Sequence, residues 1–291
     1  MNKYTVVYNK NSRGKKLSKT FLEDLFNLNN ISFDLYEVSE KKETDEIIKN
    51  AVDNSVEYFT SVGGDGSLNY LVNSLLKNNH PKPVVSCLPA GSGSDFIRTF
   101  GISQNIDEAI KHLTTESIYE IDVGKISFED KSQYFINVAN IGFLADTVRT
   151  SETVSNKLSR YRYSIGFWAK ILPAQPTEMK LIIDGNLYEG NVFNISICNA
   201  QYFGGGKNIS PKSSLQDGRF NVQIFEVDKL TAMKIFFKAN KGLHLRENGV
   251  INKLASKIEV LSRHPIESDG DFVTHTECKF SMEKGRLQFK I

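Results

Sequence analysis

Residues 63–67 read Gly63-Gly64-Asp65-Gly66-Ser67 and lie between a short apolar run at 58–62 and an amphipathic stretch that begins near Leu68. The first pattern predicts a buried strand and the second predicts a helix. Glycines at such a junction allow a tight turn and a close approach of the backbone to a ligand. The N–H groups at the start of the helix then favour an anion, phosphate above all. A carboxylate such as that of Asp65 belongs beside phosphates only where it meets a metal ion or a proton in transfer.

The chain around this loop alternates between the strand and helix periods up to about residue 120. Strand-like runs at 5–8, 31–35, 58–62 and 84–88 alternate with helical spacing at 17–28, 47–52, 68–76 and 106–113. Such alternation with short connections predicts a parallel sheet flanked by helices, as in Rossmann-like folds. After Tyr119 strand patterns dominate, among them 134–139, 191–198 and 219–227, and helical patches interrupt them only at 156–172 and 229–238. We therefore predict an α/β domain over 1–125 and an antiparallel β-sandwich domain over 126–291, with the return of the final strand to the first domain left open.

Composition limits the class of protein. The 291 residues fit about two domains at ~150 residues each, and 36 basic against 34 acidic residues leave a net charge of +2. This balance argues against a nucleic-acid binder driven by bulk charge. Cys87, Cys198 and Cys278 lie too far apart for a CxxC site, which favours a cytoplasmic location. No run approaches the ~18 apolar residues of a membrane span, so any membrane contact would be peripheral.

Two further loops follow predicted strands. One contains Gly91-Ser92-Gly93-Ser94-Asp95, and the other runs from Asn9 to Lys15 with one glycine and three basic residues. Loops that follow neighbouring parallel strands meet at the carboxyl edge of the sheet, where open α/β folds bind ligands. Ser92 could donate to a phosphate. Asp95 could cap the following short helix or serve the ligand, and the sequence favours neither.

The order of these motifs resembles the diacylglycerol kinase catalytic family, specifically its soluble bacterial lipid kinases. Gly66-Ser67-Leu68-Asn69 resembles the family's GTxN, and residues 88–96 resemble its LPxGTxNDFAR element. The other matching segments are Asp122-Val123-Gly124, Tyr134-Phe135-Ile136-Asn137, Gly142-Phe143, Tyr202-Phe203-Gly204-Gly205-Gly206, Pro211, Asp217-Gly218 and Asp269-Gly270-Asp271. The resemblance runs in family order from residue 9 to 271. Four positions depart from the family: Lys10 replaces proline, Ser67 threonine, Ser94 asparagine and Asp271 glutamate.

The resemblance implies a set of site residues. ATP would be held in the cleft between the domains, and Mg²⁺ would accompany it. The residues lining the nucleotide would be Asn9, Lys15, Ser39, Gly63, Gly64, Asp65, Gly66, Ser67, Asn69 and Ser92. Asp65 would organise magnesium or phosphate, and Asp269 or Asp271 would be the catalytic base. A structural Mg²⁺ would take Asp217 together with the backbone carbonyls of Ser214 and Arg219. From spacing alone, Asp217-Gly218 and Ser268-Asp269-Gly270 are ordinary turns.

We therefore expect an ATP- and Mg²⁺-dependent lipid kinase that phosphorylates diacylglycerol to phosphatidic acid. An apolar pocket in the β domain would hold the acyl chains, and the partner would be a lipid at the membrane surface, with no nucleic acid and with a homodimer left open. The alternatives are phosphatidylglycerol, a sphingoid base or NAD as acceptor, and a nucleotide- or lipid-binding protein that has lost catalysis. The aromatic and basic segment 159–170 is either an interfacial helix or a helix packed on a sheet, and a local patch at 157–170 would serve membrane contact.

Overall fold

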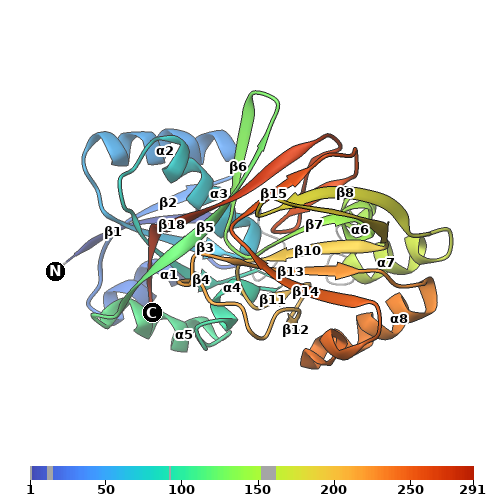
Figure 1. The fold of residues 1–291 in the computed structure, drawn as a ribbon. Helices are drawn as coiled ribbons and strands as arrows, with labels where there is room; N and C mark the ends of the chain where they lie inside the picture. The colour runs from blue at the N-terminus through green and yellow to red at the C-terminus, as the bar shows by residue number, and fades with distance from the viewer. Residues whose placement is uncertain (1, 12–15, 92, 152–161) are drawn as a thin grey trace. The chain divides into compact units, whose positions relative to one another are not determined.

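The computed structural model describes residues 2–11, 16–91, 93–151 and 162–291, with only the backbone for 162–164. The chain divides into an N-terminal unit, Met1–Ile121 with Lys284–Ile291, and a C-terminal unit, Asp122–Glu283. Figure 1 colours the chain from blue to red, and the red C-terminal end belongs to the N-terminal unit together with the blue start of the chain. The sequence placed the domain boundary near residue 125. Among the described residues, no helix is both long and apolar enough to cross a membrane.

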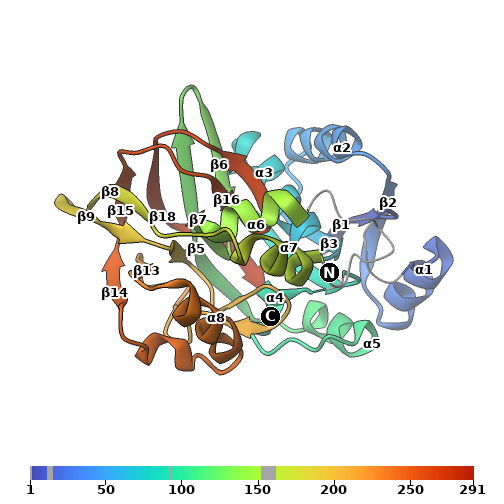
Figure 2. The ribbon, with the colours of Figure 1, turned by 90° about the vertical axis from the view of Figure 1, so that its right-hand side faces the viewer.

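The N-terminal unit is a parallel sheet covered by helices on both faces, as predicted. Its strands β1 (Lys3–Asn9), β2 (Ser32–Val38), β3 (Tyr58–Gly63) and β4 (Val84–Pro89) are ordered β2-β1-β3-β4. The helices are α1 (Lys19–Leu28), α2 (Lys41–Asp53), α3 (Asp65–Lys77), α4 (Asp95–Arg98), α5 (Ile106–Ala109) and the 3₁₀ turn η1 (Ile110–Thr114). Alternate residues of β1 (Tyr4, Val6 and Tyr8) pack with α1 and α5 in one core cluster. Helices α2 and α3 cover the other face (Figures 1 and 2).

The C-terminal unit is built mainly of antiparallel strands. The strands β7 (Val138–Gly142), β10 (Asn194–Cys198), β13 (Phe220–Phe225), β14 (Val250–Ala255), β16 (Ile266–Ser268) and β17 (Asp271–Thr274) form one sheet in the order β14-β13-β10-β7-β16-β17. The second sheet uses β5 (Ile118–Phe128), β6 (Lys131–Phe135), β8 (Thr177–Ile183), β9 (Asn186–Val192), β15 (Lys257–Val260) and β18 (Cys278–Lys290). Side chains from both sheets, including Phe135, Phe220 and Phe280, share one buried cluster. The predicted fold class, α/β followed by a β-sandwich, is confirmed.

The remaining elements of the C-terminal unit are short or helical. They are α6 (Phe143–Ser151), α7 (Arg162–Ile171), α8 (Lys229–Lys238), the 3₁₀ turns η3 (Ala239–Lys241) and η4 (Leu243–Arg246), and the small hairpin β11 (Tyr202–Phe203) with β12 (Lys207–Asn208). The predicted helix at 156–172 is described only from Arg162 onward. Strand β18 begins beside β15 in the C-terminal unit, and its last residues pair in parallel with β4 in the N-terminal unit.

Two predicted strands are divided in the structure. The run 191–198 contains the end of β9 and the whole of β10, which belong to different sheets. The apolar run 134–139 is split, because β6 ends at Phe135 and β7 begins at Val138. The backbone N–H groups of Ile136, Asn137 and Val138 all donate to the side chain of Asp269, more than 130 residues later. A residue whose N–H group bonds to a carboxylate cannot offer it to a neighbouring strand. The interruption of the strand is therefore imposed from a distant part of the chain.

Candidate functional site

The parallel strands of the N-terminal unit end at one edge of their sheet. Strand β1 ends at Asn9, β3 at Gly63 and β4 at Pro89, and Ser39 directly follows β2. The side chain of Asn9 accepts the Asn11 N–H at 2.9 Å, and the Asn11 amide donates to the Ser39 carbonyl at 3.0 Å. The structure thus brings Asn9, Ser39 and the glycine loop to one edge. Lys15 and Ser92, which the sequence analysis also placed in the nucleotide set, lie outside the described residues.

The two glycine loops at this edge pack backbone against backbone. The Gly63 carbonyl accepts the N–H groups of Ala90 at 2.9 Å and Gly91 at 3.0 Å. A Cβ on Gly91 would lie 2.2 Å from the Cα of Gly64. A Cβ on Gly63 would lie 2.5 Å from Oγ of Ser67, which places the Ser67 side chain over the start of the loop. Internal packing therefore requires glycine at these positions.

Gly66 is different, because among the described residues a Cβ there would meet no atom within 4 Å beyond its chain neighbours and its own helix backbone. The residue lies in the first turn of α3, where N–H groups have no partner within the helix. Asn69, one turn further on, is buried, and its side chain accepts from the Asn73 amide at 3.0 Å. The space beside Gly66 is therefore a cradle at a helix N-terminus, and this geometry suits phosphate.

Asp65 joins the two loops through its carboxylate. Its Oδ2 accepts the Asp95 N–H and its Oδ1 accepts the Phe96 N–H, both at 2.9 Å. These are the first N–H groups of α4, so Asp65 caps that helix from the neighbouring loop. The proposed cap by Asp95 is wrong: Ser94 is the N-cap residue with no side-chain bond, and Asp95 instead lies 3.5 Å from the Arg98 guanidinium.

In the C-terminal unit, the Asp269 carboxylate likewise accepts backbone N–H groups of a neighbouring segment, an arrangement that we call a clamp. Its two oxygens accept the N–H groups of Ile136, Asn137 and Val138 at 2.9, 3.0 and 3.0 Å. The residue has a φ of +50°, and Gly270 follows at +87°. Asp tolerates the left-handed region better than most residues, and Gly adopts it without cost. The Asp269-Gly270-Asp271 segment is thus a tight turn between β16 and β17, held by the first of its two carboxylates.

Asp271 is placed differently from Asp269. It opens β17, is partly exposed, and within the described part of the chain no hydrogen bond engages its carboxylate. Two aspartates separated by one glycine therefore differ in chemistry. Three backbone donors occupy the Asp269 carboxylate, whereas the Asp271 side chain is partly exposed at the start of β17.

Glu267 lies behind this turn, and the sequence analysis missed it. Its side chain is fully buried, one oxygen accepts the Gly270 N–H at 3.0 Å, and the other bonds to the Asn140 amide. Burial raises the pKa of Glu267 to about 8, with a smaller contribution from the charges of Asp269 and Asp271, while the two hydrogen bonds act in the opposite direction. No local pattern identifies it, because its burial is set by the tertiary fold and all three residues of β16 are buried.

A chain of buried polar groups leads from Glu267 to the start of α6. The side-chain oxygen of Asn140 accepts from Ser196 Oγ at 2.6 Å and from the Asn194 side-chain amide at 3.2 Å. The side-chain oxygen of Asn194 in turn accepts the Leu144 N–H at 2.9 Å. Buried polar networks are rigid when their groups are satisfied. This one connects the Asp269-Gly270-Asp271 turn with the wall of a pocket.

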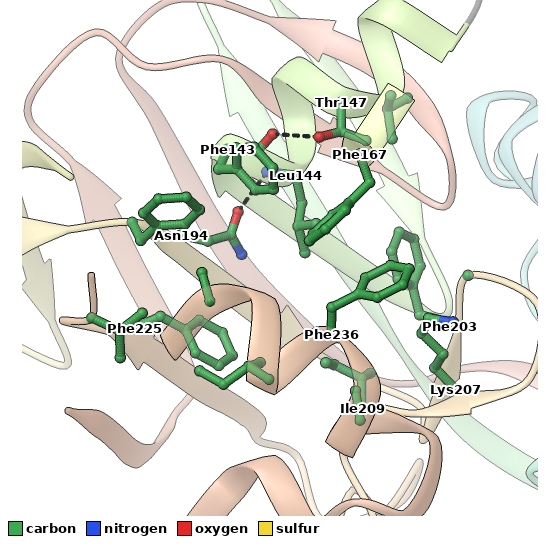
Figure 3. A pocket seen from close by; sticks show the side chains of 17 residues that line it. Phe143, Leu144, Thr147, Phe167, Asn194, Phe203, Lys207, Ile209, Phe225 and Phe236 are labelled. Atoms are coloured by element: carbon green, nitrogen blue, oxygen red, sulfur yellow. Dashed lines mark hydrogen bonds between the residues drawn. The ribbon is translucent and has the colours of Figure 1, made fainter. Parts of the chain in front are cut away.

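That pocket lies within the C-terminal unit and encloses about 890 Å³ including its open mouth. Figure 3 shows Phe143, Phe167, Phe225 and Phe236 on its walls, with Asn194 at one side and Lys207 at another. Helices α6, α7 and α8 supply many of the lining residues, and the hairpin β11–β12 supplies Phe203 and Lys207. An elongated apolar ligand with a polar end fits such a site.

The predicted metal site at Asp217 is an exposed turn. One Asp217 oxygen accepts the Arg219 N–H at 3.0 Å. The N–H of the intervening Gly218 donates to the Asp122 carboxylate at 2.7 Å. Ser214 is also exposed. Within the described residues no three His, Cys, Asp or Glu side chains gather as a metal site. Asp217 with two backbone carbonyls would be an all-oxygen set, the type that Mg²⁺ takes.

Comparisons with known proteins agree with this arrangement. Residues 3–126 match the family model "Diacylglycerol kinase catalytic domain", and residues 137–289 match "YegS C-terminal NAD kinase beta sandwich-like domain". A diacylglycerol kinase of Staphylococcus carnosus is 27% identical over 97% of this chain and 93% of its own length. A diacylglycerol kinase of Bacillus subtilis is 28% identical over 77% of this chain and 74% of its own.

A solved structure has the same fold. That of a diacylglycerol kinase from Bacillus anthracis superposes with a TM-score of 0.74, covers 99% of this chain and 96% of the other, and is 21% identical in sequence.

Proposed function

Since the chain belongs to the diacylglycerol kinase family and is a lipid kinase, we propose that it transfers the γ-phosphoryl group of ATP to a lipid hydroxyl. Diacylglycerol is the proposed acceptor and phosphatidic acid the product. The pocket carries this proposal, because it offers a long lipid an apolar interior and a buried polar network that runs to the Asp269-Gly270-Asp271 turn. The proposal places the enzyme in the cytosol, with transient contact at the membrane surface.

We assign the nucleotide phosphates to the carboxyl edge of the N-terminal unit. The proposed contacts are Asn9, Lys15, Ser39, Gly63, Gly64, Asp65, Gly66, Ser67, Asn69 and Ser92. The open space beside Gly66 supports this assignment, because no packing among the described residues accounts for a glycine there. When bound, Mg²⁺ would neutralise the charge of the phosphates during transfer.

Asp65 acts in this proposal through the backbone. By accepting the N–H groups of Asp95 and Phe96, its carboxylate sets the second glycine loop against the first. Phosphoryl transfer depends mainly on the positioning of groups around the phosphates. Asp65 therefore organises the phosphate site, and its carboxylate would be the group that meets the metal ion when one is bound.

For the general base we propose Asp271. A lipid hydroxyl becomes a good nucleophile when a positioned carboxylate takes its proton. The Asp269 carboxylate already accepts three backbone N–H groups, and its removal from that clamp would release the turn. Asp271 accepts the hydroxyl proton, Asp269 fixes the turn from the side of β7, and Glu267 fixes Gly270 from within the sheet.

A structural Mg²⁺ at Asp217 remains a separate part of the proposal. The carboxylate of Asp217 and the carbonyls of Ser214 and Arg219 would hold it. Titration with Mg²⁺ should raise the melting temperature of the wild-type protein and should not raise that of Asp217→Asn. Equal shifts in both proteins would exclude this site.

The function is tested by incubating the protein with γ-labelled ATP and a panel of acceptors. The panel contains diacylglycerol, phosphatidylglycerol, sphingosine and NAD, each lipid in mixed micelles. We expect labelled phosphatidic acid as the main product. Preferential labelling of another lipid would identify that lipid as the acceptor instead of diacylglycerol. Labelling of NAD alone would contradict a lipid acceptor. Tight ATP binding with no labelled product from any acceptor would support a binding protein without catalysis.

A further inference from the structure

Exposed apolar side chains are concentrated on two helices of the C-terminal unit. Six of the twelve large hydrophobic residues that are exposed in the described chain fall within 165–172 and 230–243. We call this surface the α7–α8 face and define it by Ile165, Trp168, Leu172, Leu230, Phe237 and Leu243. Leu172, Leu230 and Phe237 expose 76%, 67% and 61% of their surface. Grouped apolar exposure of this kind marks a surface that meets a partner or a membrane.

The two helices pack against each other through aromatic rings. The rings of Phe167 and Phe236 stack with centroids 4.0 Å apart, and Trp168 lies 6.1 Å from both Phe236 and Phe237. Lys229 Nζ also bonds to the Leu172 carbonyl. Figure 2 shows α7 and α8 side by side. The α7–α8 face is therefore one continuous surface.

The same helices form part of the pocket wall. Phe167 and Phe236 point into the pocket in Figure 3, whereas Trp168 and Phe237, their neighbours in sequence, are exposed on the outside. The outer apolar surface and the inner apolar wall are thus two sides of one thin layer. A lipid chain would stay in contact with apolar groups on its way from outside to inside.

Lysines border this face. Helix α8 carries Lys229, Lys234 and Lys238 and contains no acidic residue, and Lys170 and Lys241 lie at the ends of α7 and η3. The acidic residues nearest in sequence are Asp228, which caps α8, and Glu247, which pairs with Lys238. Five lysines against two acidic groups contrast with the near balance of the whole chain, whose net charge is +2.

We propose that the α7–α8 face binds an anionic lipid bilayer, with its exposed rings and leucines in the interfacial region and its lysines at the headgroups. Interfacial helices combine these two features. A symmetric dimer through this face would place the same patch on itself, so lysine would face lysine, and charge therefore favours the bilayer. The inference rests on the proposed function in one respect, namely that the pocket receives its lipid from this membrane.

Trp168 makes the proposal directly measurable, because it is the only tryptophan of the chain. The protein is mixed, without ATP, with vesicles of phosphatidylcholine alone or with added phosphatidylglycerol. We expect a blue shift of the emission and quenching by brominated acyl chains on the anionic vesicles. High salt should weaken the binding, because it screens the lysines. Failure to bind anionic vesicles, or binding without quenching of Trp168, would overturn the proposal.

Variants distinguish binding through the α7–α8 face from nonspecific hydrophobic adsorption. Phe237→Ser should lower partitioning into anionic vesicles by about tenfold, as expected for loss of a buried aromatic contact. Lys234→Glu should act in the same direction at low salt. Leu187→Ser is the matched control, since Leu187 is 59% exposed on β9 of the same unit. An equal loss in Leu187→Ser, or conversion of a dimer to a monomer by Phe237→Ser in size-exclusion chromatography, would contradict the bilayer assignment.

Vesicle binding and kinase activity can fail independently. Activity on short-chain diacylglycerol in detergent micelles does not require a bilayer. Full activity on micelles without vesicle binding would contradict the role of the α7–α8 face in membrane binding and would leave the proposed function intact. Vesicle binding with Trp168 quenching, but without phosphorylation of any lipid, would do the reverse.

Discussion

Asp65 in the N-terminal unit and Asp269 in the C-terminal unit use their carboxylates in the same way. Asp65 accepts two backbone N–H groups of a neighbouring loop, and Asp269 accepts three. They differ in what stands beside them. Next to Asp65 is Gly66, which opens a space for a ligand, and next to Gly270 is a second carboxylate, Asp271.

Under the proposed function, this difference lets one local device serve two kinds of chemistry. Where phosphate must be received, the clamp leaves a glycine cradle with positive helix dipole and no further acid in the turn. Where a proton must be accepted, the clamp leaves an aspartate without a hydrogen-bond partner among the described residues. In a glycine turn, one acidic residue can therefore hold the backbone while an acidic residue beside it takes part in the reaction.

The largest predicted effect is on the catalytic rate. Asp271→Asn removes the proposed base while keeping the size of the side chain, and kcat should fall by about 10²–10⁴-fold, the usual contribution of general base catalysis. The unfolding free energy should stay within about 0.5 kcal/mol of the wild type. Steady-state kinetics on diacylglycerol micelles and urea denaturation measure the two quantities. A kcat of Asp271→Asn near that of the wild type would contradict Asp271 as the general base and would favour Asp269.

The second effect is on stability. Asp269→Asn keeps a residue that tolerates positive φ but replaces one acceptor oxygen by a donor facing backbone N–H groups, so the unfolding free energy should fall by about 3 kcal/mol. Asp65→Asn should also lose stability, because its carboxylate accepts two backbone N–H groups.

Asp184→Asn is the matched control for Asp269→Asn. Asp184 likewise accepts backbone N–H groups, from Ser256 and Lys257, and is exposed. It should lose stability while the folded protein keeps its kcat. If Asp269→Asn abolished turnover and left the unfolding free energy unchanged, the clamp would not be the role of Asp269.

The sequence predicted those parts of the fold that depend on local patterns. The parallel half follows from changes of hydrophobic period and from glycine loops, and the position of the loop at 63–67 required nothing distant. The strand at 134–139 was predicted wrongly, because its interruption depends on Asp269, which no local pattern connects to it. The strand 250–255 contains Asn252 and Lys253 and lacks a clear apolar alternation, and the sequence did not predict it. A final strand was expected, but its bounds, Cys278–Lys290, were not predicted.

The candidate site divides in the same way. Its residue types were readable from the motifs, but their separate roles were not. The sequence treats Gly66 and Gly91 alike, whereas packing within the chain requires only the second. It also treats Asp269 and Asp271 alike. Glu267 was overlooked, because its importance arises from burial next to Gly270 and Asn140 rather than from spacing.

The third prediction concerns pH. The pKa of Glu267 is raised from 4.5 to about 8 in the folded protein. Between these values the unfolded chain releases a proton that the folded chain keeps, so the unfolding free energy should fall as pH rises, by at most about 1.4 kcal/mol per pH unit. The contribution is fully present below pH 4.5 and is lost above about pH 8.

Urea denaturation between about pH 6.5 and 8 isolates this effect. Burial lowers the pKa values of His112 and His244 to about 4, and these histidines act with the opposite sign only below their ordinary value of about 6.5. Glu267→Gln should flatten the slope in this window whatever its absolute stability. A slope unchanged in Glu267→Gln would show that another group titrates there.

The smallest predicted effect tests the open space next to Asp65. Gly66→Ala should raise the unfolding free energy by about 0.5–1 kcal/mol, because alanine is the better helix residue and its Cβ meets nothing within 4 Å. The same methyl group would occupy the proposed phosphate cradle, so the affinity for ATP, measured by calorimetric titration, should fall. Gly91→Ala is the matched control, since its Cβ would lie 2.2 Å from the Cα of Gly64 and should destabilise the loops. If Gly66→Ala bound ATP as tightly as the wild type, the open space beside Gly66 would not be where the phosphates bind.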